Sequence, residues 1–232
     1  MIPKTIHYCW FGPKPLPKSV ISCIKSWNAQ LPGYELKLWN ENNSPMDIPF
    51  VSEAYKARKY AFVSDYVRFW ALYNYGGVYL DTDMFVIRSF DGFLENECFF
   101  GWETPEKEII SCGVIGSTRE NPFIQLILDS YNRVKFDLKN KDSIIVTRHI
   151  SRCYEKYTGK HQIRLYDFDF FYPFPYEEKE NVRNYMKFKT KQTHAIHLWS
   201  ISWGSSKDKF IERLLYHLKN IIWFKFGKVF SS

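Results

Sequence analysis

The sequence predicts a single α/β domain, in which a sheet is flanked by helices. Short β-prone apolar runs alternate along the chain with longer stretches whose apolar residues recur at helical spacing. The chain has 232 residues, and 45% of them are hydrophobic, so one large domain with a sizeable core is expected. No repeat, low-complexity tract or flexible linker divides it.

The composition limits which classes of partner and which cellular compartment are expected. The balance of 32 basic and 25 acidic residues gives a net charge of +7, which favours nucleotide phosphates, an anionic membrane surface or nucleic acid. Aromatic residues make up 19%, which suits a pocket that stacks rings or sugars. The 5 cysteines are odd in number and form no Cys-x-x-Cys pair, so a reducing compartment is expected. Neither a signal peptide nor an apolar run of membrane-spanning length is recognised.

The first predicted strand is Ile6 to Phe11, which Gly12 and Pro13 terminate. In open α/β sheets, ligands collect beyond the carboxyl ends of strands. Trp10 lies at such an end, where it is either a base-stacking residue or a core tryptophan. A helix over Ser19 to Ala29 and an alternating strand over Pro32 to Trp39 follow.

The next long stretch, Glu53 to Gly76, has helical spacing, with a predicted restart at Ser64 as N-cap. Asp65 and Arg68 are three residues apart and therefore share one helix face. They form either a local ion pair or a pair that binds sugar hydroxyls and phosphate.

Two carboxylates follow a short buried strand in the segment Tyr75 to Phe85. Gly76 and Gly77 supply a turn, and the run Val78 to Leu80 is apolar and β-prone. In an extended chain Asp81 and Asp83 point to the same side, about 6–7 Å apart at Cα. Such carboxylates repel unless a cation lies between them, which points to Mg²⁺ or Mn²⁺. The alternative is a polar strand end that caps a turn.

The second half of the chain continues the alternation with four predicted elements and a further strand. These are strands at Cys98–Glu103 and Ser111–Gly116, helices at Asn121–Val134 and Ser143–Tyr157, and a short strand within His194–Trp203. A second Asp-x-Asp, Asp167 and Asp169, lies among aromatic residues without a preceding Gly-Gly turn. We interpret it as a structural strand and loop.

Three blocks in register resemble one enzyme family: Ile6 to Gly12, Ala61 to Arg68, and Gly76 to Asp83. They are similar to glycosyltransferase family 32, whose members carry a DXD sugar-binding motif, and to the related clostridial glucosylating toxins. The resemblance implies the GT-A fold, a Rossmann-like mixed sheet flanked by helices. It also implies transfer with retention at the anomeric carbon.

The resemblance implies a donor site and a metal site. Trp10 would stack on the nucleotide base, and Asp65 and Arg68 would bind the donor sugar and its phosphate side. The residues assigned to the donor are Trp10, Asp65, Arg68, Tyr79 and Trp203. The residues assigned to the metal, usually Mn²⁺ and otherwise Mg²⁺, are Asp81, Asp83 and His197. The catalytic set is Asp65, Arg68, Asp81 and Asp83.

Two segments depart from the family pattern. Relatives often carry Asn where this chain has Ser111-Cys112-Gly113, and Thr-Gly-Pro where it has Thr147-Arg148-His149. Trp102 and Glu103 precede the first of these segments and are predicted acceptor contacts.

The resulting function is transfer of a sugar from a nucleoside diphosphate to a hydroxyl of a glycan or lipid-linked acceptor in surface polysaccharide (capsule or lipopolysaccharide) biosynthesis. One alternative is a phosphatase of the haloacid-dehalogenase type, but Phe85 stands where that motif needs Thr or Val. Another is a non-catalytic sugar-binding module. A glycosidase would need carboxylates on both sides of a sugar, which the phosphate-binding context argues against. No nucleic-acid partner is expected.

The C-terminus predicts a location. We place the domain at residues 1–206 and an amphipathic helix and tail at 207–232. Apolar residues from Phe210 to Leu218 recur at helical spacing, whereas four aromatic residues and two lysines crowd the tail from Ile221 onward. Basic aromatic segments lie in membrane interfaces. The enzyme is therefore predicted to be cytoplasmic and peripheral on the inner face of the cytoplasmic membrane.

Overall fold

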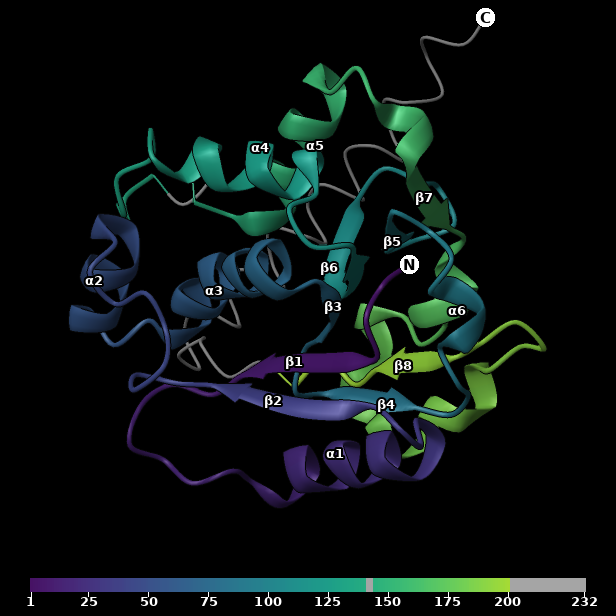
Figure 1. Cartoon of the computed structure of the whole chain (residues 1–232). Coiled ribbons are helices and arrows are strands. Elements are labelled where there is room, and N and C mark those ends of the chain that lie inside the picture. Colours follow the sequence, from purple (N-terminus) through teal and green to yellow (C-terminus); the bar gives the residue numbers. More distant parts are fainter. Residues whose placement is uncertain (141–143, 201–232) are drawn as a thin grey trace, which may run out of the picture. The chain divides into compact units, whose positions relative to one another are not determined.

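The computed structural model describes residues 1–140 and 144–200 (Figure 1). Trp203 and the predicted C-terminal segment, with the boundary at residue 206, lie outside the described residues. Among the described residues no helix is both long and apolar enough to cross a membrane.

A mixed six-stranded sheet forms the centre of the domain (Figure 1). In spatial order its strands are β2 (Glu35–Trp39), β1 (Thr5–Cys9), β3 (Gly77–Leu80), β6 (Ile110–Ser117), β5 (Cys98–Trp102) and β7 (Ile163–Tyr166). β1 is parallel to β2 and β3, and β5 is parallel to β7, whereas β6 is antiparallel to both of its neighbours. A separate two-stranded sheet pairs β4 (Met84–Val86) with β8 (Ala195–His197). The predicted mixed sheet is confirmed.

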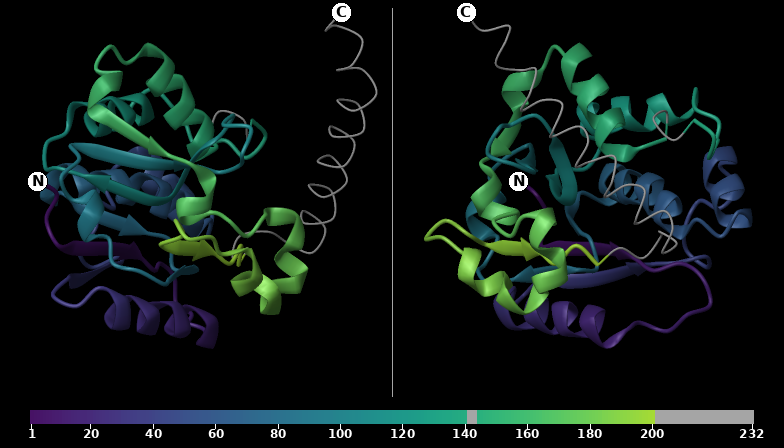
Figure 2. Two further views of the ribbon diagram at one scale, coloured as in Figure 1. Left: turned by 90° about the vertical axis from the view of Figure 1, so that its right-hand side faces the viewer. Right: turned by 180° about the vertical axis from the view of Figure 1, so that it is seen from behind.

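Helices cover both faces of this sheet, with α1 on one side and α3, α4 and α5 on the other (Figures 1 and 2). The α-helices are α1 (Lys18–Gln30), α2 (Pro49–Lys56), α3 (Tyr60–Tyr75), α4 (Pro122–Tyr131), α5 (Val146–Lys156) and the short α6 (Phe168–Phe171). The 3-10 segments are η1 (Asp91–Phe93), η3 (Lys160–Gln162) and η4 (Tyr176–Phe188).

The pleat of β3 explains why two hydrophobic cores form. Successive side chains of a strand point to opposite faces. Val78 and Leu80 join the core that contains Trp27 of α1, whereas Tyr79 between them joins the core that contains Phe69 of α3. Since every residue of β3 is buried, both faces must be covered, which is the α/β arrangement that the sequence predicts.

Two glycines fix the start of β3. Gly76 and Gly77 have φ of +64° and +108°, a region in which residues with a Cβ are strained. A Cβ on Gly77 would also lie 2.7 Å from the Thr5 carbonyl oxygen and 2.9 Å from Nε2 of His7. The glycines therefore let β3 approach β1 closely, as the predicted turn requires.

Three local predictions are wrong. The helix breaks after Lys56 and restarts at Tyr60, whereas Ser64 lies inside α3 and its hydroxyl donates to the Tyr60 carbonyl oxygen at 3.2 Å. The chain is not extended at the carboxylates, because Met84 N donates to Asp81 O at 3.0 Å and closes a turn. Finally, Asp167 precedes the helix α6, so the second Asp-x-Asp is not in a strand.

Candidate active site

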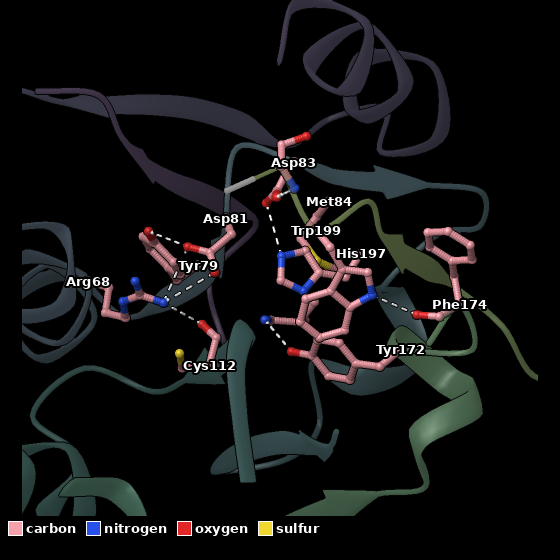
Figure 3. Close-up of polar contacts among 12 residues, drawn as sticks. Arg68, Tyr79, Asp81, Asp83, Met84, Cys112, Tyr172, Phe174, His197 and Trp199 are labelled. Atoms are coloured by element: carbon pink, nitrogen blue, oxygen red, sulfur yellow. Dashed lines mark hydrogen bonds and ion pairs between the residues drawn. The ribbon is translucent and has the colours of Figure 1, made fainter. Parts of the chain in front are cut away.

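Arg68 is the centre of a buried charged cluster beneath the exit of β3 (Figure 3). Its side chain is 5% exposed, and it pairs with Asp65 at 2.6 Å and with Asp81 at 3.3 Å. It also donates to the Cys112 carbonyl oxygen at 2.8 Å, and its guanidinium carbon lies 4.7 Å from the centre of the Tyr79 ring. Every branch of the guanidinium therefore has a protein partner, and Arg68 holds Asp81 in place.

Burial governs the charges in this cluster. Burial raises the pKa of Asp65 to about 7. The positive charge of Arg68 lowers this pKa by less than burial raises it, and the negative charge of Asp81 adds a smaller rise. Burial lowers the pKa of Arg68, but the acidic groups around it, Asp81 foremost, together outweigh burial, and the pKa lies well above its usual range. Arg68 is therefore a permanent cation next to Asp81.

Asp81 has two further contacts that orient it. The Tyr79 hydroxyl donates to Asp81 Oδ1 at 3.0 Å, and the Asp81 amide donates to the Gly113 carbonyl oxygen at 2.9 Å. A Cβ on Gly113 would lie 3.3 Å from Asp81 Oδ2, so the absent side chain keeps that oxygen uncrowded. Tyr79 itself is 1% exposed, and its hydroxyl orients Asp81. Its contact with the donor stays a prediction.

Asp83 is held by the last residue of β8 and by the segment that follows this strand (Figure 3). Its Oδ1 lies 3.1 Å from His197 Nε2, and its Oδ2 accepts the Ser200 amide at 2.7 Å. Burial raises the pKa of Asp83, but His197 and the Ser200 amide outweigh burial and leave this pKa below its usual value. Burial lowers the pKa of His197, but the charge and hydrogen bond of Asp83, with smaller contributions from Asp81 and Glu103, together raise this pKa above its usual value.

Trp199 covers the pair of Asp83 and His197 on one side. Its ring centre lies 3.9 Å from that of His197, and its indole N–H donates to the Phe174 carbonyl oxygen at 2.7 Å (Figure 3). Trp199 also has a φ of +53°, which a residue with a Cβ adopts only where its surroundings fix it. Nδ1 of His197 is buried and has no hydrogen-bond partner among the described residues.

The donor set fits a hard divalent cation that shares its ligands with a substrate. Among residues 1–140 and 144–200 no three His, Cys, Asp or Glu side chains form a preassembled metal cage. Mg²⁺ sites typically use one or two protein carboxylates together with substrate phosphates. Asp81 and Asp83 supply such a pair, and each carboxylate oxygen keeps lone pairs beyond its present hydrogen bonds. The metal roles of Asp81, Asp83 and His197 stay predictions.

The remaining predicted site residues lie at strand ends. Trp10 follows β1, is half-buried and belongs to neither hydrophobic core, while its indole donates to the Lys14 carbonyl oxygen at 2.7 Å. Glu103 follows β5 and is half-buried. Burial raises its pKa, although His197 and Ser111 each lower it. Asp167 pairs with Lys107 at 2.6 Å, a surface contact that agrees with a structural role.

Sequence reasoning missed Tyr172. Its buried hydroxyl oxygen accepts the Val114 amide at 2.8 Å, next to Gly113, and its ring lies 6.0 Å from that of His197. The two partners are 58 residues apart, so no local pattern announces the contact. Only the aromatic run around Tyr172 could have marked it for attention.

Comparison with known proteins identifies the region that holds the carboxylates. Residues 17–100 match the family described as the glycosyltransferase sugar-binding region containing the DXD motif. Residues 17–100 belong to that family. This glycosyltransferase region includes Asp65, Arg68, Asp81 and Asp83, and it contains two of the three sequence blocks, Ala61 to Arg68 and Gly76 to Asp83. The inferred family resemblance is confirmed.

The curated relatives extend the match beyond this region. The chain is 30% identical over 141 residues to inositol phosphoceramide mannosyltransferase 3 of Schizosaccharomyces pombe, covering 59% of this chain and 39% of the relative. It is 25% identical over 140 residues to mannosyl phosphorylinositol ceramide synthase CSH1 of Saccharomyces cerevisiae, covering 58% and 36%. The chain thus spans well under half the length of these relatives.

Solved glycosyltransferases share the fold. The PaToxG glycosyltransferase superposes with a TM-score of 0.56 at 18% identity, over 68% of this chain and 71% of that one. The apo form of the glycosyltransferase GlyE of Streptococcus pneumoniae superposes with a TM-score of 0.53 at 12% identity, over 96% and 63%. The predicted GT-A fold is confirmed.

Proposed function

We propose that this chain is a metal-dependent, retaining glycosyltransferase that moves a sugar from a nucleoside diphosphate to an acceptor hydroxyl. One observation carries the proposal: Asp81 and Asp83 lie at the exit of β3, inside the family-matched region, and each is oriented by its own set of partners. The phosphatase and sugar-binding alternatives find no support, because the matched family and the relatives are glycosyltransferases.

The chain's own residues would divide the work as follows. Arg68 and Tyr79 fix Asp81, and His197 and Ser200 fix Asp83, so both carboxylates are preorganised to hold Mn²⁺ or Mg²⁺ with the diphosphate. When bound, the cation supplies Lewis-acid neutralisation of the departing diphosphate. Trp10 stacks on the base from the end of β1. Asp65 binds the donor sugar, while the predicted phosphate contact of Arg68 requires it to release one of its present partners.

The names of the relatives guide the choice of substrates to test. Two of them are named as a mannosyltransferase and a synthase of mannosylated ceramide lipids, so mannose is the first donor sugar to test. We propose a lipid-linked or glycan hydroxyl as acceptor, in the assembly of a surface polysaccharide such as capsule or lipopolysaccharide. Glu103 and Trp102 are the proposed acceptor contacts.

We also propose that the enzyme is cytoplasmic and peripheral on the inner membrane face. The support is the sequence from Ile221 to Phe230, where Trp223, Phe224, Phe226 and Phe230 alternate with Lys225 and Lys228. Flotation of the variant Lys225→Glu/Lys228→Glu with anionic vesicles tests this proposal.

A donor screen by mass spectrometry in the presence of Mn²⁺ tests the activity. We expect Asp81→Asn and Asp83→Asn each to lower transfer at least about a hundredfold, the usual range for loss of a charge-stabilising group. Asp167→Asn is the matched control, since it changes the second Asp-x-Asp, and it should keep full activity. Circular dichroism checks that all variants are folded. Near-normal turnover of either site variant in metal-free buffer contradicts the metal role.

A further inference from the structure

A strongly basic segment remains outside the site described above. Residues 181–200 contain no acidic residue. The first half of this segment contains four basic residues, Arg183, Lys187, Lys189 and Lys191. All four basic side chains are exposed. A fifth cation joins them from another element, because the exposed guanidinium of Arg88 donates to the Lys191 carbonyl oxygen.

Packing turns apolar side chains outward in the same segment. The inner side of η4 is anchored by two ring contacts, Tyr185 with Phe85 and Phe188 with Phe174, each at 5.3 Å between ring centres. Val182 and Met186, four residues apart, are left 37% and 38% exposed. We call the exposed side chains of residues 182–191 together with Arg88 the basic patch. Figure 2 shows its light-green η4 beside β8.

The acidic residues of η4, Glu177, Glu178 and Glu180, all precede the basic patch. Among the described residues, no cation of the basic patch forms an ion pair with a carboxylate, since the ion pairs there involve other side chains. Exposed apolar side chains surrounded by unpaired cations favour a partner with anionic groups over an apolar layer. Lipid head groups above acyl chains have that structure, whereas nucleic acid or an acidic peptide would leave Val182 and Met186 unused.

We propose that the basic patch is the surface by which the folded domain docks on an anionic lipid bilayer. The patch is connected to the candidate active site through aromatic contacts: Tyr176 of η4 packs on Trp199 at 5.5 Å, and Trp199 packs on His197. Docking there holds the carboxylates near the bilayer, where a lipid-linked hydroxyl is presented. Only that last consequence rests on the proposed function; the docking does not.

Flotation of the full chain with vesicles tests the docking. The vesicles are phosphatidylcholine alone or phosphatidylcholine with phosphatidylglycerol. We expect binding only to the anionic vesicles, and a decrease of roughly tenfold or more in the double variant Arg183→Glu/Lys187→Glu, since each basic side chain adds to the attraction. Lys56→Glu/Arg58→Glu, with the same charge change at exposed positions in and just after α2, is the control and should bind like the parent.

Membrane binding by the tail is tested in the same flotation experiment with the variant Lys225→Glu/Lys228→Glu of the full chain. The docking proposal is overturned if the patch variant binds anionic vesicles like the parent, or if the control loses as much binding as the patch variant. It is also overturned if the patch variant loses affinity for an anionic polymer such as heparin and keeps its affinity for vesicles. Flotation needs no donor, so a chain that floats as expected but transfers no sugar refutes the proposed function alone.

Discussion

At the scale of single residues, His7 shows how one neutral side chain ties three elements together. Its ring is fully buried, Nε2 lies 2.6 Å from the Gly76 carbonyl oxygen, and Nδ1 accepts the Trp39 indole N–H at 3.1 Å. An indole nitrogen only donates, so Nδ1 must be unprotonated and Nε2 must carry the proton. A second proton would set two donors against each other.

This geometry predicts acid lability. Burial, aided by the charge of Lys37 and opposed by the bond to Gly76, lowers the pKa of His7 from 6.5 to about 4. The unfolded chain therefore binds more protons between these values, and the stabilising effect, complete above pH 6.5, is lost as the pH falls toward 4. The loss amounts to about 3 kcal/mol of unfolding free energy.

Urea unfolding of the parent and of His7→Gln at several pH values measures this effect. The difference in unfolding free energy between the two proteins should shrink as the pH falls from 6.5 to 4. His161→Gln changes an exposed histidine and should follow the parent throughout. A difference that is independent of pH contradicts the assignment.

At the scale of elements, α4 owes its start to one side chain. Asn121 is 4% exposed, and its Oδ1 accepts the amides of Phe123 at 2.9 Å and Ile124 at 3.3 Å. Asn121→Ala leaves both amides without this acceptor and should destabilise the domain by about 1–2 kcal/mol. Asn121→Asp retains the acceptor and should cost less. Thermal unfolding of the three proteins measures the effect, and equal stability of the alanine and aspartate variants contradicts the cap.

The helices and strands differ in how well the sequence predicts their positions. Gly76 and Gly77 followed by three β-prone residues locate β3, because only that combination allows a sharp turn into a buried strand. The break between α2 and α3 escapes prediction, because it depends on a positive φ at Arg58, where no glycine marks it. Strands β4 and β8 have three residues each, too few for a periodic pattern, and their pairing joins Met84 to His197 across the chain.

Some residues of the candidate site can be recognised from the sequence, and others only from the structure. Asp65, Arg68, Asp81 and Asp83 are recognisable because their spacing is local and matches the family motif. Tyr172, Ser200 and the support from Tyr79 are visible only in three dimensions, because each depends on how strands and loops pack around the exit of β3.

At the scale of the whole molecule, the donor should stabilise the fold. A ligand that binds only the folded chain raises its stability by mass action, about 2.7 kcal/mol at a hundred times the dissociation constant. We expect the correct nucleoside diphosphate with Mn²⁺ to raise the melting temperature, and the others to have smaller effects.

The same measurement tests the base-stacking role of Trp10. Trp10→Ala should weaken nucleotide binding by about 1–3 kcal/mol, the usual range for lost stacking between a base and an aromatic side chain. Trp70→Phe alters a half-buried tryptophan that packs against the α3 core and serves as control. An unchanged dissociation constant of Trp10→Ala for every nucleoside diphosphate rules out stacking.

The contacts of Asp83 also set an order of events during synthesis. Its partners His197 and Ser200 emerge from the ribosome more than a hundred residues after it, as the separations of 114 and 117 positions show. Until then β4 has no β8 to pair with, and a carboxylate that is 14% exposed in the finished domain has no ion-pair partner. A nascent chain that stops before residue 195 therefore contains the whole family-matched region and still lacks an assembled candidate site. Nonsense mutations late in the reading frame should be as damaging as substitutions in the motif itself.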